Sequence, residues 1–126
     1  MNSNEQMEKL LHGGSVTLGY VYQDGKRDEY WFEGTPENMA SFLARFPAAD
    51  KVILTDSLDN LVLNSFGSFI DTCPDKELLG QVLQYLIPMQ MGEAEPAEFF
   101  CPTVEDVEKY ADGNYEYGNG GGMTLD

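Results

Sequence analysis

The chain has 126 residues, the length of a single domain with one hydrophobic core. Hydrophobic residues make up 42% of it, so we expect it to fold, and 22 acidic against 7 basic residues give a formal net charge of −15. This charge argues against direct nucleic-acid binding and against attraction to an anionic membrane, and it favours a basic protein surface as the partner.

The N-terminal residues 4–11 are expected to form a short helix that stops at Gly13-Gly14. This region lacks the basic start and apolar run of a signal peptide, and nowhere does the chain approach the ~20 apolar residues of a membrane span. Two cysteines, Cys73 and Cys101, are too few for a disulfide framework. We therefore expect a cytoplasmic protein.

The next segment, SVTLGYVYQDGKRDEYWFE, predicts a β-hairpin centred on Asp24-Gly25. A two-residue turn would pair Leu18 with Trp31, whereas a three-residue loop would pair Leu18 with Tyr30. We prefer the three-residue loop because it gathers most of the large side chains on one face of the sheet. That face would hold Val16, Leu18, Tyr20, Tyr30 and Phe32, with Trp31 beside Thr17 and diagonal to Gly19 on the other.

Two helices and a second hairpin are predicted next. Thr35 and Pro36 suit the N-cap and first position of a helix that ends at Pro47. Residues 52–54 and 61–63 are the arms of the second hairpin, and a second amphipathic helix runs from the CPD sequence to Pro88. Units of hairpin then helix thus occur at about 15–46 and 51–87, and we hypothesise a structural duplication. The simplest architecture is α+β, a largely antiparallel four-stranded sheet (ββαββα) with both helices on one face.

From Glu93 the composition changes, which divides the chain into an α+β core (1–92) and an acidic C-terminal extension (93–126). The extension holds one short helix, Thr103 to Ala111, opened by a Thr-x-x-Asp capping pattern, and a Gly-rich flexible tail. Aromatic residues among its acids are typical of a segment that docks on a basic protein surface. Alternatively, Phe99 and Phe100 simply attach it to the domain. The predicted binding residues are Trp31, Glu93, Glu95, Glu98, Glu105, Asp106, Glu108, Tyr110, Tyr115 and Tyr117. Trp31 is either a contact residue on an exposed sheet face or covered by a terminal segment.

The sequence TCPDKELL raises the question of a reactive thiol at Cys73, since a helix N-terminus lowers a thiol pKa. A catalytic thiol also needs a base, and the single histidine, His12, is far away in sequence. Proline and a carboxylate recur at all three helix starts, so we interpret the stretch as a helix start and predict no catalytic residue.

A cation site is the other chemistry considered, since Asp56, Asp59, Asp71 and Asp75 lie near the second hairpin and helix. The sequence DSLDN lacks the spacing of a calcium loop, and two cysteines with one histidine do not make a zinc site. We interpret these residues as turn aspartates and predict neither a metal nor a cofactor.

These observations favour a non-catalytic protein that acts by protein–protein interaction through its acidic, aromatic C-terminal third. Alternatives are a DNA mimic of the antirestriction type, an accessory protein of a bacterial mobile element, a carboxylate-dependent enzyme using a pair such as Asp56 and Asp71, and a small-ligand binder around Trp31. Monomer and homodimer both stay open.

Overall fold

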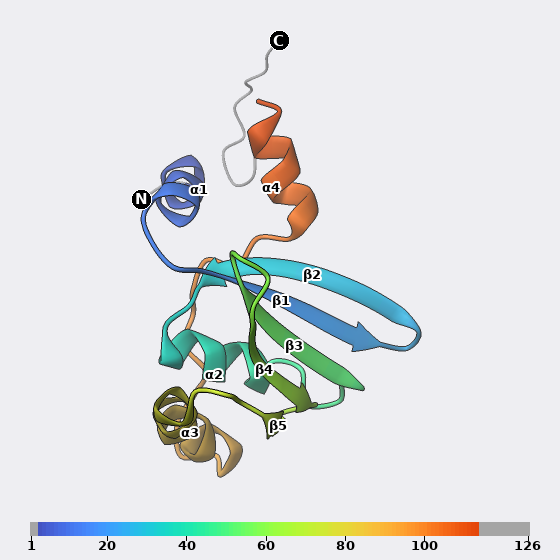
Figure 1. The fold of residues 1–126 in the computed structure, drawn as a ribbon, viewed down its shortest axis with the longest axis vertical. Helices are drawn as coiled ribbons and strands as arrows, with labels where there is room; N and C mark the ends of the chain where they lie inside the picture. The colour runs from blue at the N-terminus through green and yellow to red at the C-terminus, as the bar shows by residue number, and fades with distance from the viewer. Residues whose placement is uncertain (1–2, 114–126) are drawn as a thin grey trace.

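Nine helices and strands follow one another in the computed structural model, which describes residues 3–113 (Figure 1). They are α1 (Ser3–His12), β1 (Val16–Gln23), β2 (Lys26–Glu33), α2 (Pro36–Ala44), β3 (Lys51–Asp56), β4 (Leu61–Phe66), β5 (Phe69–Thr72), α3 (Lys76–Gln90) and α4 (Val104–Ala111).

The strands form one antiparallel sheet in the order β2-β1-β3-β4-β5. The α+β class and the antiparallel pairing confirm the prediction, but the prediction of four strands and a ββαββα order is wrong. A short fifth strand, β5, lies between the second hairpin and α3. Gly67, with φ of 59°, begins the tight turn from β4 to β5 and allows Phe66 to pair with Phe69.

The register of the first hairpin also differs from the predicted one. The turn has two residues, Asp24 with φ of 55° and Gly25 with φ of 77°, and both positive angles fit the tight turn that matches the twist of a hairpin. Leu18 consequently pairs with Trp31, and Thr17 with Phe32. The three-residue loop, with Trp31 beside Thr17, is therefore wrong.

Small side chains on β1 explain that error. The helix-facing side of β1 carries Thr17, Gly19 and Val21, which are all buried. A Cβ on Gly19 would lie 2.6 Å from two ring carbons of Phe42, so the glycine makes room for that ring. The buried face is filled by side chains from α2, and counting large residues along β1 alone therefore selects the wrong face.

Helices α2 and α3 pack together on this face and close the main core (Figure 1). Its fully buried side chains include Phe32, Phe42, Leu43, Val52, Leu54, Leu63, Val82 and Leu86. Placing the two predicted helices on one face is consistent with this arrangement. Helices α1 and α4 instead build a second, smaller cluster around Met7 and Val107.

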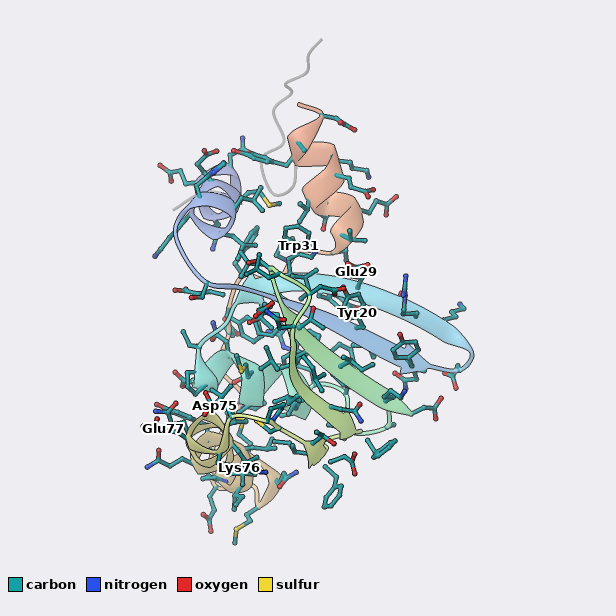
Figure 2. The ribbon with its side chains drawn as sticks, viewed as in Figure 1. Tyr20, Glu29, Trp31, Asp75, Lys76 and Glu77 are labelled. Atoms are coloured by element: carbon teal, nitrogen blue, oxygen red, sulfur yellow. The ribbon has the colours of Figure 1, made fainter. Side chains whose placement is uncertain are left out.

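The helix ends follow the expected start chemistry. Thr35 caps α2 by accepting from the Asn38 N–H at 3.1 Å, with Pro36 at the first helical position. Asp75 caps α3, accepting from the N–H groups of Glu77 and Leu78 (Figure 2 labels the start of this helix). Helix α3 continues to Gln90, two residues beyond the predicted end at Pro88.

Candidate functional site

We call residues 93–103, which connect α3 to α4, the acidic strap. It carries three of the predicted binding residues, Glu93, Glu95 and Glu98. Its aromatic pair divides between the two clusters of the fold. Phe99 packs against the main core, with its ring centroid 5.4 Å from that of Phe32. Phe100 packs against the second cluster with Met7 and Val107. The strap therefore joins both clusters, and one open question is answered: Phe99 and Phe100 do attach the segment to the domain.

Polar contacts fix the strap at further points as it passes α2 (Figure 1). The Ala97 N–H donates to Ser41 Oγ at 2.8 Å. At the far end of the strap, the backbone N–H of Trp31 donates to the Pro102 carbonyl at 2.9 Å. The guanidinium of Arg45 lies 4.2 Å from the centre of the Phe99 ring. A segment without regular secondary structure is thus held at several points along its length.

Helix α4 continues directly from this anchored strap. Thr103 accepts from the Asp106 N–H at 3.2 Å and Asp106 accepts in return from the Thr103 N–H at 3.4 Å, the capping box that the sequence predicts. The Tyr110 hydroxyl bonds to the Glu8 carboxylate of α1, and this bond raises the tyrosine pKa. Asp106 and Tyr110 therefore have structural contacts of their own.

The remaining predicted carboxylates point to solvent. Glu93, Glu95, Glu98, Glu105 and Glu108 are all exposed. Within the described part of the chain, none of the five makes an ion pair with a basic side chain. Five exposed carboxylates without a basic partner thus follow the anchored strap and α4 along the molecule. We call these five residues the acidic face.

Trp31 lies at the junction of α1, α4 and the sheet (Figure 2). Its side chain is half-buried against the second cluster, so of the two alternatives the structure has the covered one. The buried indole Nε1 has no hydrogen-bond partner among the described residues. Tyr115 and Tyr117, also predicted to bind, lie outside the described residues.

Farther along the sheet, the face opposite the main core carries aromatic side chains beside cations. Tyr20 pairs with Glu29 on the neighbouring strand (Figure 2). Arg27 lies 5.6 Å from the centre of the Tyr20 ring, and Lys51 lies 5.7 Å from that of Tyr22. These cations cover the rings, which limits the apolar area offered to a small ligand.

Neither cysteine has the environment of a nucleophile. Cys73 is buried, its thiol donates to the Asp75 carbonyl at 3.4 Å, and burial raises its pKa. Burial raises the pKa of Cys101 to about 12, although the charge of Arg45 opposes the shift. His12 is engaged with Glu8 on α1 at 3.3 Å. Both thiols are thus held in the unreactive protonated form.

The aspartates of the second hairpin have turn roles. Asp56 accepts from the N–H groups of Leu58 and Asn60, each at 2.9 Å, and the hydrogen bonds from Asn60 and Leu58 lower its pKa. Asp75 is the cap of α3. In residues 3–113, no group of three or more His, Cys, Asp or Glu side chains is placed to hold a metal ion.

Four exposed apolar side chains have no counterpart among the predicted sites. Phe66 and Phe69 flank the β4–β5 turn and are 51% and 71% exposed, while Ile87 and Met91 at the end of α3 are 46% and 65% exposed. We call these four residues the apolar end. Its sequence signal is the lack of charge in residues 60–70 and 78–92.

Comparison of the chain with models of protein families, with curated proteins and with solved structures found no match in any of the three. None of the described helices is both long enough and apolar enough to span a membrane.

Proposed function

We propose that the protein is a non-catalytic interaction module whose acidic face docks on a basic surface of another protein. The observation that carries the proposal is the combination of an anchored strap with unpaired carboxylates. Phe99 and Phe100 hold the strap by its aromatic side chains, and the glutamates on either side of them stay in solvent.

Ordering of the strap before binding favours this use. A flexible acidic segment loses conformational entropy when it docks, whereas an anchored one has already lost much of it on folding. The chain's net charge of −15 adds a long-range attraction that raises the rate of encounter with a basic partner. The acidic face thus combines steering with preorganisation.

Two further features support a non-catalytic, cytoplasmic interaction protein: the state of its cysteines and the pKa of Asp56. The thiols of Cys73 and Cys101 are unpaired, as a reducing compartment maintains them, and burial keeps them protonated. Among the described carboxylates, Asp56 has a lowered pKa, the opposite of what a general acid at neutral pH needs. We therefore propose binding, with no cofactor.

The test replaces the five glutamates of the acidic face by glutamine in the full chain. A matched control neutralises five other exposed carboxylates, Asp24, Asp28, Glu33, Asp50 and Asp59, as their amides. Both variants change the net charge equally, so only position distinguishes them. Affinity capture from a bacterial lysate with each protein, followed by titration of the captured partner, measures the difference.

We expect the native chain and the control to capture a protein rich in lysine and arginine, and the glutamine variant to lose it. Affinity should fall steeply with added salt because the contact is between exposed charges. Equal loss in the two variants would mean that net charge alone matters. Retention by the glutamine variant would refute the acidic face as the site.

A further inference from the structure

A pocket lies where α1, the first hairpin, the start of α2 and the strap meet. Figure 1 shows α1 above the end of the sheet where β1 begins and β2 ends. The pocket has a volume of about 150 Å³, and an apolar cavity of about that size accommodates a benzene ring. Gly13 and Gly14 line it without contributing side chains, and a Cβ on Gly14 would meet no other described residue within 4 Å beyond its chain neighbours. The loop from α1 to β1 therefore leaves this space unfilled.

The inner wall of the pocket is apolar. Leu10 of α1 is buried, and Phe99 and Phe100 of the strap are both half-buried. The strap positions both rings firmly, because Phe99 packs against the main core and Phe100 against the second cluster. An apolar group that replaces water against this wall gains burial without rearranging the fold.

Two groups of opposite charge stand at the outer rim. Lys9 comes from α1 and Glu33 from the end of β2, and both side chains are exposed. Within the described residues, neither of them makes an ion pair with the other or with a third side chain. Gln6 also lines the pocket, one helical turn before Lys9 on the same side of α1. On the other side, the Asn38 side chain donates to the Glu33 backbone carbonyl at 2.9 Å and thereby holds the backbone that carries the carboxylate.

We infer that this pocket binds a free α-amino acid with an apolar side chain, such as leucine or phenylalanine. The ligand ammonium meets the carboxylate of Glu33, and the ligand carboxylate meets Lys9, with the Gln6 amide as a second donor. The apolar side chain of the ligand lies inward against Leu10 and the two phenylalanines. A ligand with one charge would leave either Lys9 or Glu33 without a partner.

The charge of the whole chain favours a ligand of this kind. An amino acid carries both charges and no net charge, so the chain's net charge of −15 does not repel it as it would an anion. None of the five described glutamates of the acidic face lines the pocket. Binding of the amino acid is therefore a property separate from docking on a basic protein.

An NMR titration of the isotope-labelled full chain with L-leucine tests the inference, because it detects weak binding and also locates it. We expect saturable shifts at the amides around the pocket, such as those of Gly14, Ser15 and Phe100, with a Kd on the order of 1 mM for so small a ligand. Glycine, isocaproate and leucinamide lack, in turn, the apolar side chain, the ammonium and the carboxylate. Each should bind at least about tenfold more weakly than leucine.

Variants at the rim show which charge recognises which end of the ligand. Lys9→Gln and Glu33→Gln should each weaken leucine binding about tenfold. Lys9→Gln should then no longer distinguish leucine from leucinamide, and Glu33→Gln should no longer distinguish leucine from isocaproate. Matched controls are Lys26→Gln and Asp28→Asn, which are exposed at the opposite end of β2 and should bind leucine as the native chain does.

Three results would overturn the inference. The first is the absence of saturable shifts at the pocket amides. The second is an affinity for isocaproate or leucinamide equal to that for leucine, since one rim charge would then have no role. The third is an equal effect of the rim variants and their controls, which would assign any binding to the overall charge of the chain.

Discussion

The acidic segment, made of the strap and α4 and called the acidic end below, and the apolar end use their phenylalanines in opposite ways. At the acidic end, Phe99 and Phe100 point inward and the charged neighbours point outward. At the apolar end, Phe66 and Phe69 themselves face solvent and no charged residue separates them. Anchoring aromatics stabilise the fold, whereas exposed aromatics contribute little burial to it.

This contrast gives the two ends a different dependence on salt. The proposed binding through the acidic face should weaken as ions screen it, whereas contacts made by the exposed phenylalanines should not. Substitutions at one end that leave the other intact test whether the two ends behave independently.

The largest expected effect is on the alkylation rate of Cys101, which lies in the strap and packs against the main core. With a pKa raised to about 12, its thiolate fraction at pH 8 is about a thousandfold below that of an unperturbed thiol. Alkylation by iodoacetamide in the folded Cys73→Ala variant should be slower by a similar factor and should recover in urea. Reaction at the rate of a free cysteine would show that the strap opens readily.

The same shift affects stability at alkaline pH. The folded thiol holds its proton more tightly than the unfolded one, so its contribution is fully present below about pH 9 and is lost as the pH rises toward 12. Urea unfolding across this range should show a smaller decline for Cys101→Ala than for the native chain. An equal decline would assign the effect to other groups, such as Tyr30, whose pKa is also raised by burial.

Next in size is a pair of identical substitutions at the two ends. Phe99→Ala should lower the free energy of unfolding by about 3 kcal/mol, a factor of roughly a hundred in the equilibrium constant, because it empties a site against Phe32 and Arg45. Phe69→Ala should change it by less than about 0.5 kcal/mol at low protein concentration. Chemical denaturation measures both, and similar losses would contradict the division into anchored and exposed aromatics.

The smallest predicted effect is the loss of stability on removing a helix cap, and it is compared at two helices. Thr103→Ala and Asp75→Ala each remove a cap worth about 1 kcal/mol. Helix α3 carries Val82 and Leu86 of the main core, so Asp75→Ala should lower the global stability. Helix α4 contacts mainly α1 and β2, so Thr103→Ala should chiefly speed hydrogen exchange within α4. Equal global losses would mean that the acidic end unfolds together with the core.

Much of the fold is readable from the chain because its signals are local. Asp-Gly at the first turn, Thr35-Pro36 at α2 and the capping pattern at Thr103 each specify a start or a turn by their own chemistry. The prediction failed where a distant residue decides. The register of the first hairpin was predicted wrongly because the buried face of β1 was chosen by its large side chains. Gly19 on the face that is actually buried leaves room for the Phe42 ring of α2, which the sequence of β1 does not reveal.

The site shows the same limit. The acids of the extension are evident from composition, and five of them are exposed as expected of a contact surface. The contact of Tyr110 with Glu8 emerges only from the packing of α4 near α1, whereas the capping pattern already indicated the contact of Asp106 with Thr103. The missed strand β5 has four residues, too short for alternation to be recognised. Whether residue 92 is a true domain boundary, and whether the two hairpin–helix units superpose, stay predictions.

The position of Trp31 gives this molecule a built-in optical reporter. It is the single tryptophan of the chain, and its ring lies where α1 and α4 meet the sheet. An indole that loses those neighbours becomes hydrated and its emission moves to longer wavelength. The emission wavelength of Trp31 should therefore report, without any label, whether α1 and α4 stay packed against the sheet when a partner binds.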